Sequence, residues 1–208
     1  GGLSGSAQRF DGVPLLTPWP DQRIAAEKVR DLDLLRALAD GTPCRVPTSL
    51  SAADSCPSIA PACGGSRWLR KAPDSRGGLG TRWLDRLVDL APDEIVQRWV
   101  AGRAFGATIL ANGSQATLLG VCQLRFTRKG PFPFVYCGSV GPILVSEPIQ
   151  QGLTEMARRI SHSIGLRGLF NIDFVTDRSG PLWLLEINPR WSGSSELIER
   201  QLRRRQPE

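Results

Sequence analysis

The residues best suited to chemistry lie in the last third of the chain, where two short stretches combine carboxylates with amides. The first is Asn171-Ile-Asp173, and the second is Glu186-Ile-Asn188, which leads through a proline to Arg190. Carboxylate and amide oxygens are ligands suited to Mg²⁺, which usually takes one or two carboxylates together with phosphate oxygens. A guanidinium followed by a small-residue loop and a helix start favours a phosphate or acyl phosphate. The pattern therefore predicts a magnesium site next to a phosphate.

The two stretches are predicted to be neighbouring strands of one hairpin, at 169–176 and 182–188, joined by 177–180. If the loop has an even length, the numbers of paired residues sum to about 357, so Asp173 lies opposite Leu184 and Asn171 opposite Glu186. Alternation along each strand then gives the two faces. The polar face carries Asn171, Asp173, Glu186 and Asn188, and the apolar face carries Ile172, Phe174, Trp183, Leu185 and Ile187. An odd-length loop would reverse this parity, and a hairpin with one solvated face is the simpler alternative.

Two earlier segments contain groups suited to a nucleotide. Lys71 ends a predicted strand at 68–71 and precedes three glycines, Gly77, Gly78 and Gly80. Glycines let backbone N–H groups approach phosphate oxygens, although this loop matches no standard phosphate-binding motif and a flexible turn is an equal alternative. A strand predicted at 94–100 has a backbone that could face an adenine edge, while its Trp99 could equally belong to the core.

The elements around these residues mix helices with antiparallel hairpins. Helical periodicity marks 21–39, 147–164 and 192–201, and Ser194 or Ser195 is available to cap the last helix. Strands are predicted at 104–111 and 116–126, with a turn at Asn112-Gly113. The Pro- and Gly-rich segment 130–142 is expected to be a loop or an irregular strand lining a cleft. This order favours an α+β fold.

Composition excludes several classes of protein. With 41% hydrophobic residues over 208 positions, the chain is expected to be globular, and its lack of a long apolar run or signal-peptide pattern favours the cytoplasm. The five cysteines include no C-x-x-C pair, so free thiols are expected rather than disulfides or zinc. A net charge of +6 fits a solvated basic surface, an anionic substrate or nucleic acid. His162 is expected to be a surface or packing residue.

In order and spacing, these segments resemble the ATP-grasp superfamily over about residues 21–199. The stretches 118–124 and 136–142 look closest to its carboxylate–amine ligase and carbamoyl-phosphate-synthetase-like branch. The resemblance implies an α+β ATP-grasp fold with the nucleotide between two subdomains, 21–103 and 104–208, after an irregular segment at 1–20. Since the chain starts at Gly1 without a methionine, the family's separate N-terminal α/β domain is expected to precede it.

The resemblance also implies roles for individual residues. Asp173, Glu186 and Asn188 would hold Mg²⁺ or Mn²⁺, and Arg190 would lie beside the transferred phosphoryl group. Lys71 and the loop Gly77–Gly80 would contact phosphates. The hinge strand would read adenine through backbone atoms near Arg98 and Val100, and it comprises Gln97, Arg98, Trp99 and Val100.

Two positions depart from the family pattern. Where the family has an early phosphate-contacting lysine, counting back from Gly41-Thr-Pro43 reaches Arg30, which keeps the charge. After the hinge, Gly102-Arg103-Ala104 offers no acid to bind ribose.

The implied reaction is ATP-dependent ligation of small molecules, in which a carboxylate attacks the γ-phosphate and an amine captures the acyl phosphate. ADP and phosphate would be released, with Lys71 and Arg190 neutralising charge during phosphoryl transfer. One alternative is a module that binds nucleotide without turnover. Another is a basic nucleic-acid-binding domain, which would leave the segregated carboxylate face unexplained. The sequence identifies neither substrate, and a homo-oligomer is compatible with it.

Overall fold

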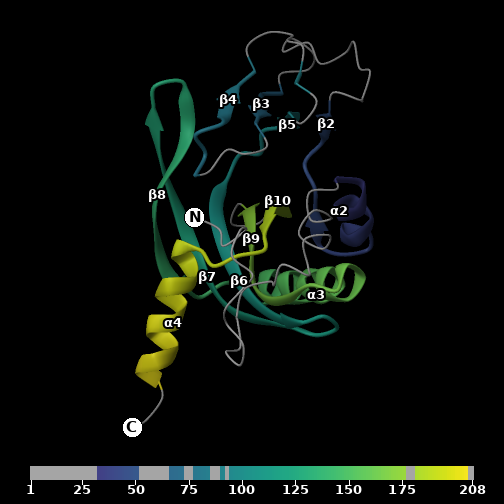
Figure 1. Ribbon diagram of the computed structural model, residues 1–208, viewed down its shortest axis with the longest axis vertical. Coiled ribbons are helices and arrows are strands. Elements are labelled where there is room, and N and C mark those ends of the chain that lie inside the picture. Colours follow the sequence, from purple (N-terminus) through teal and green to yellow (C-terminus); the bar gives the residue numbers. More distant parts are fainter. Residues whose placement is uncertain are drawn as a thin grey trace, which may run out of the picture. The chain divides into compact units, whose positions relative to one another are not determined.

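The computed structural model describes residues 32–51, 66–72, 77–84, 90–91, 94–176 and 181–205. In chain order the elements are α2 (Leu32–Ala39), β1 (Cys44–Arg45), β2 (Ser49–Ser51), β3 (Trp68–Lys71), β4 (Thr81–Trp83), β5 (Ile95–Arg98), β6 (Arg103–Asn112), β7 (Ala116–Lys129), β8 (Phe132–Ile143), α3 (Glu147–Ile164), β9 (Arg167–Thr176), β10 (Leu182–Asn188) and α4 (Gly193–Arg205) (Figure 1). The predicted N-terminal segment 1–20 and Arg30 lie outside the described residues. The α+β class is confirmed.

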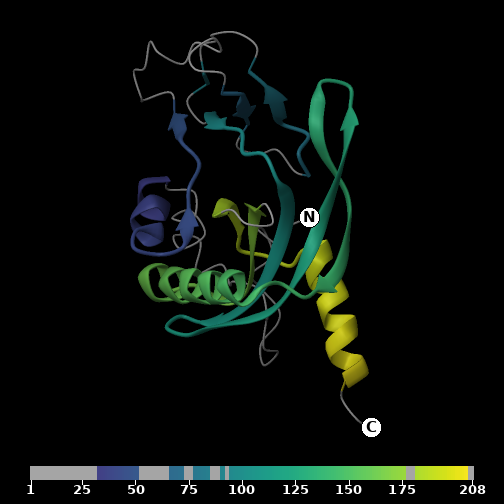
Figure 2. The ribbon, with the colours of Figure 1, turned by 180° about the vertical axis from the view of Figure 1, so that it is seen from behind.

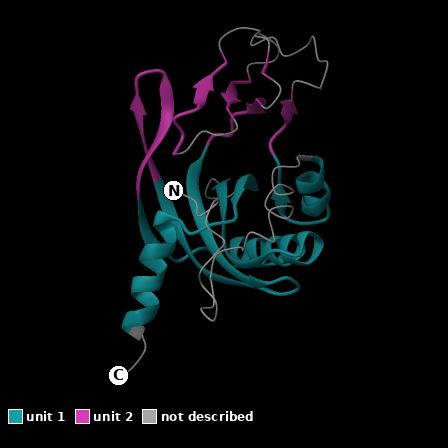
Figure 3. Cartoon of the chain, viewed as in Figure 1, with its two compact units in different colours: residues 1–46, 102–124, 139–208 teal, residues 47–101, 125–138 magenta. Residues whose placement is uncertain are grey.

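The chain divides into two compact units, each built from separate stretches of sequence (Figure 3). Unit 1 comprises residues 1–46, 102–124 and 139–208, and unit 2 comprises residues 47–101 and 125–138. The functional subdomains 21–103 and 104–208, which the resemblance implies, stay a prediction.

A six-stranded sheet in the order β1-β10-β9-β6-β7-β8 forms the frame of unit 1. Strand β1 runs parallel to β10, while β9 pairs antiparallel with both β10 and β6. The pairing of β6 with β9 is continuous from Arg103 opposite Thr176 to Asn112 opposite Arg167. Strand β9 therefore lies inside the sheet, flanked by a partner on each side.

One face of this sheet packs against α2 and α3, which lie side by side in both views (Figures 1 and 2). Helix α3 has the predicted bounds because Pro148 suits its first turn and Gly165, at φ 73°, ends it in the left-handed conformation. Its apolar stripe includes Leu153, Met156 and Ile160, which are buried with Ile172 and Phe174 of β9 in one core cluster. This face supplies the hydrophobic core of unit 1.

Helix α4 packs on the other face, where small residues leave it room. A Cβ at Gly120 would lie 3.1 Å from Cγ1 of Ile198, and one at Gly106 would lie 3.1 Å from Oγ of Ser194. The cap prediction is wrong by a few residues, because Ser192 and not Ser194 or Ser195 precedes the helix. The Ser195 N–H donates to the Ser192 carbonyl at 3.0 Å, and the Ser192 N–H donates to Ser195 Oγ at 3.3 Å.

Of the two alternatives expected for 130–142, a loop or an irregular strand, the structure shows a strand. The segment forms most of β8, a 12-residue strand at the edge of the sheet beside β7. Proline lacks a backbone donor and is tolerated at a sheet edge, where one side of the strand needs no partner. The prolines that suggested a loop therefore mark an edge strand.

Unit 2 contains a four-stranded sheet in the order β2-β5-β3-β4. Strand β5 pairs antiparallel with both β2 and β3, so Gln97 lies opposite Ser49 on one side and Leu69 on the other. In the described part of the chain, no helix is long and apolar enough to cross a membrane.

Candidate functional site

The carboxylate hairpin of unit 1 has the predicted polar face but a different register. Glu186 lies opposite Asp173 and Asn188 lies opposite Asn171, whereas Trp183 and Leu184 pair with Val175 and Phe174. The register shifts between Leu184 and Glu186, because Leu185 is the extra residue of a β-bulge. The predicted pairs, Asp173 with Leu184 and Asn171 with Glu186, are therefore wrong.

The bulge explains why the face prediction still succeeds. Up to Leu184 the strands pair as they would across an odd-length loop. Continued in that register, β10 would turn Glu186 and Asn188 toward the core. The extra residue at the bulge returns both side chains to the face that carries Asp173. The assignment of Leu185 to the apolar face is wrong, since Leu184 pairs with Phe174 and is buried in its place. Trp183 is half-buried, and the Arg45 guanidinium lies 5.7 Å from the centroid of its ring. Trp183 therefore also lies outside the main core.

Direct contacts join the polar residues of this face. Nδ2 of Asn188 donates to Oδ2 of Asp173 at 3.1 Å, and the Arg190 guanidinium donates to Oδ1 of Asn188 at 3.2 Å. The side chains of Glu186 and Arg190 are exposed, while Asp173 is half-buried. The site thus gathers two carboxylates, an amide oxygen and an exposed guanidinium on one surface of unit 1.

This donor set fits a hard cation of the Mg²⁺ type. Asp173, Glu186 and Asn188 offer oxygen atoms, and phosphate or water oxygens would complete an octahedral shell. Among the described residues, no group of three or more His, Cys, Asp or Glu side chains is placed to hold a metal ion. With two carboxylates and one amide, the donor set suits a cation that also takes phosphate oxygens.

The predicted phosphate loop belongs to unit 2 and is built tightly. Lys71 lies at the end of β3, opposite Thr81 of β4 and Ile95 of β5. Gly77 and Gly78 have φ of 60° and 82°, and the Gly80 carbonyl accepts from the Ala72 N–H at 3.1 Å. The Gly77 carbonyl accepts from the Tyr136 N–H at 2.9 Å, so the loop is hydrogen-bonded to β8.

Gly78 has a structural reason to be glycine. A Cβ at this position would overlap the carbonyl group of Phe134 in β8, and the positive φ is one that L side chains rarely adopt. A phosphate role for Gly77, Gly78 and Gly80 stays a prediction.

The predicted adenine strand, β5, is partly occupied by contacts within unit 2. The Gln97 side chain is buried and donates to Ser49 Oγ at 3.1 Å. The backbone N–H groups of Arg98 and Trp99 donate to the carbonyls of Thr48 and Arg67 at 2.8 Å each. An adenine edge could therefore not use the N–H groups of Arg98 and Trp99 while they keep these bonds.

Trp99 is half-buried and takes part in an aromatic stack. Its ring meets that of Trp83 edge to face at 5.7 Å, and the Arg67 guanidinium lies 3.5 Å from the centroid of Trp83. This stack was not predictable from the sequence, because its members come from three separate segments.

The sequence also missed a hydroxyl network beneath the hairpin. Thr108 of β6 and Ser195 of α4 both donate to Oδ1 of Asn171, at 2.8 Å and 3.3 Å. Isolated serines and threonines carry no pattern, so only the strand and helix packing reveals these partners.

Comparison with known proteins gives a consistent result. The family model described as an ATP-grasp domain matches residues 25–194. The chain is 25% identical over 138 residues to the arginine-specific carbamoyl phosphate synthase large chain of Bacillus subtilis, covering 60% of this chain and 13% of that protein. It is 25% identical over 128 residues to D-alanine–D-alanine ligase of Pelotomaculum thermopropionicum, covering 60% of this chain and 39% of that protein.

A solved structure shares the fold. The biotin carboxylase domain of Hydrogenobacter thermophilus 2-oxoglutarate carboxylase, determined with MgADP, ADP and bicarbonate, aligns with a TM-score of 0.64 at 16% identity, over 91% of this chain and 45% of that one. The expected α+β ATP-grasp fold is thereby confirmed over most of the chain. The chain spans less than half the length of each of these three proteins.

Proposed function

Because the chain belongs to the ATP-grasp family, whose members are usually ATP-dependent carboxylate–amine ligases, we propose that it activates a carboxylate with Mg-ATP for capture by an amine. The observation that carries this proposal is the polar face of the β9–β10 hairpin, where the bulge at Leu185 sets Glu186 and Asn188 beside Asp173. Arg190 donates to Asn188 at the same face. A simple solvated surface would have no need of this register shift.

The proposed reaction has two steps. A carboxylate oxygen attacks the γ-phosphorus of ATP and ADP leaves, which gives an acyl phosphate. The amine nitrogen then attacks the acyl carbon, loses a proton and expels inorganic phosphate, which leaves an amide bond.

The protein's part in these steps is positioning and charge neutralisation. Asp173, Glu186 and Asn188 would hold Mg²⁺, which when bound neutralises charge on the phosphates. Arg190 would face the transferred phosphoryl group and stabilise the charge that develops on its oxygens. Lys71 would contribute a second positive charge.

The other residues that the resemblance implies would supply the remaining nucleotide contacts. The glycines at 77, 78 and 80 would face phosphates, and backbone atoms of Arg98 and Val100 would face adenine. Gln97 and Trp99 would support that strand through their contacts with Ser49 and Trp83. Arg30 would contact phosphate from outside the described residues. The names of the relatives support a carboxylate substrate, as in D-alanine–D-alanine ligase.

The test is Glu186→Gln, compared with Glu199→Gln as the matched control, since Glu199 is a half-buried glutamate of α4 that pairs with Arg203. Calorimetric titration with ATP, with and without Mg²⁺, should show metal-linked binding in the wild type and in the control. The Glu186 variant should lose about tenfold or more of the Mg²⁺-dependent affinity, since even indirect partners of metal sites cost that much. Unchanged metal-linked binding in Glu186→Gln would refute the site assignment.

Turnover is measured separately, as ADP release across a panel of amino acids offered as carboxylate and amine. ADP release that requires both substrates supports ligation. Metal-linked binding with no release across the panel would favour a module that holds nucleotide without turnover.

A further inference from the structure

The side chain of Asn171 is the most completely engaged polar group of the hairpin. It is 1% exposed and faces α4 from the centre of β9. Its Oδ1 accepts from the hydroxyls of Thr108 and Ser195, and its Nδ2 donates to the Arg190 carbonyl oxygen at 2.7 Å. A carbonyl can only accept, so the amide orientation is fixed by this contact.

The Arg190 main chain is held at both of its polar atoms. Its N–H donates to the Asn188 carbonyl at 2.8 Å, and its carbonyl receives the Asn171 amide. With both atoms bonded, the direction in which the Arg190 side chain leaves the backbone is fixed. The guanidinium then reaches Oδ1 of Asn188 at 3.2 Å.

We propose that Asn171 is a positioning residue, which holds the Arg190 main chain so that the guanidinium stays at the carboxylate face. That the guanidinium meets a phosphate rests on the proposed function, whereas the hydrogen bond that holds the Arg190 main chain does not. Asn171 does not act as a metal ligand, because both acceptor positions of its oxygen are taken by hydroxyl groups and its nitrogen is a donor.

Two properties of the site support this role over simple core filling. An apolar side chain of similar size would fill the same space, yet would leave the Arg190 carbonyl without this donor. An aspartate would keep the bonds from Thr108 and Ser195, but would turn an acceptor toward that carbonyl. Asparagine supplies an acceptor for β6 and α4 and a donor for Arg190 in one side chain.

The test compares Asn171→Asp with Thr108→Val at pH 7.5. The first removes the donor to Arg190 and keeps both acceptor contacts, while the second removes one hydroxyl from the same buried network and keeps the bond to Arg190. Asn171→Leu, which adds no buried charge, is the second variant should the aspartate prevent folding. Unchanged hydrogen exchange in α3 reports that unit 1 remains folded.

The first measurement is hydrogen exchange of the 189–195 segment in nucleotide-free protein. We expect about tenfold faster exchange in the Asn171 variants, the effect of losing roughly one buried hydrogen bond, and near wild-type exchange in Thr108→Val. Equal exchange in both classes of variant would overturn the positioning role.

The second measurement is the ratio of Mg-ATP to Mg-ADP affinity, which reports contact with the terminal phosphate. The Asn171 variants should lower this ratio about as far as Arg190→Ala does, by about tenfold. A ratio that falls in Arg190→Ala but stays at the wild-type value in the Asn171 variants would overturn the proposal. If the wild type shows no Mg-linked ATP binding, the proposed function fails, and the exchange result alone decides whether Asn171 holds Arg190.

Discussion

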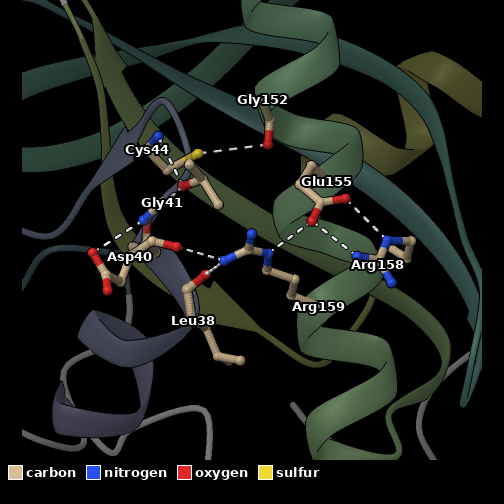
Figure 4. Close-up of polar contacts among 10 residues, drawn as sticks. Leu38, Asp40, Gly41, Cys44, Gly152, Glu155, Arg158 and Arg159 are labelled. Atoms are coloured by element: carbon tan, nitrogen blue, oxygen red, sulfur yellow. Dashed lines mark hydrogen bonds and ion pairs between the residues drawn. The ribbon is translucent and has the colours of Figure 1, made fainter.

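Replacing Glu155 with glutamine should destabilise unit 1 in a pH-dependent way. Glu155 lies on α3 and accepts from Arg158 at 2.9 Å and from Arg159 at 2.7 Å (Figure 4). Arg159 also donates to the Leu38 and Asp40 carbonyls at 3.1 Å and 2.6 Å, so it caps the C-terminal end of α2. Glu155 thus orients the arginine that joins the two helices.

The size of the effect follows from the pKa of the Glu155 carboxyl. Hydrogen bonds from Arg158 and Arg159 lower this pKa from 4.5 to about 2. The full difference would correspond to about 3 kcal/mol, but the side chain is 35% exposed and solvent screens the pair. We therefore expect a loss of about 1 kcal/mol at pH 7, which lowers Tm by about 2–4 °C in a chain of this size.

The direction with pH is fixed by the lowered pKa. The carboxylate stabilises the fold above its ordinary pKa of 4.5, and this contribution disappears as the pH falls toward 2. At pH 3 roughly two-fifths of it should remain. The assay is thermal unfolding of wild type and Glu155→Gln from pH 7 to pH 3. The control is Glu199→Gln, a glutamate of similar exposure that pairs with Arg203 on its own helix. A Tm equal to that of the wild type at pH 7, or a difference that does not shrink toward pH 3, would refute this reasoning.

Two further predictions concern a glycine and a thiol. Gly78→Ala should lower Tm more than Gly77→Ala. Both glycines have positive φ, but a Cβ at Gly78 would meet Phe134 within 4 Å, whereas a Cβ at Gly77 would meet none of the described atoms. The extra cost in thermal unfolding is about 1–3 kcal/mol, and equal losses would contradict the packing against Phe134. Burial raises the pKa of the Cys122 thiol from 9.0 to about 11, so at pH 8 this buried thiol should react with iodoacetamide more slowly than the exposed Cys137. Peptide mass spectrometry measures both rates, and similar rates would contradict the burial of Cys122.

Long periodic elements were predictable from the sequence. The helix at 147–164 has a regular apolar stripe, a proline in its first turn and a glycine after its last residue, and its bounds are confirmed. Alternation within each strand was predictable as well, because it depends only on local geometry, so Asn171 shares a face with Asp173 and Glu186 shares one with Asn188. That the two pairs share the same face depends on the bulge at Leu185, which the sequence analysis did not predict. These signals lie within a few residues of the structure they specify.

The features that sequence could not supply depend on distant partners. Prolines in 130–142 left a loop and an irregular strand equally open, because a sheet edge tolerates proline and edge position is set by the whole sheet. The engaged amide of Asn171 needs hydroxyls from β6 and α4, which lie 63 positions before it and 24 after it. The stack of Arg67, Trp83 and Trp99 likewise forms only when three segments of unit 2 meet.

The bulge at Leu185 also governs which changes of chain length the hairpin tolerates. Deleting Leu185 would leave Glu186 opposite Asp173 and Leu184 opposite Phe174, since the remaining residues would then pair in a regular register. Beyond Glu186 the register is regular, so a deletion of Ile187 would not be absorbed by a bulge. It would turn Asn188 toward the core face. When related sequences are aligned across this hairpin, a gap at 185 is therefore compatible with the full polar face, whereas a gap at 187 keeps Glu186 opposite Asp173 but moves Asn188 off that face.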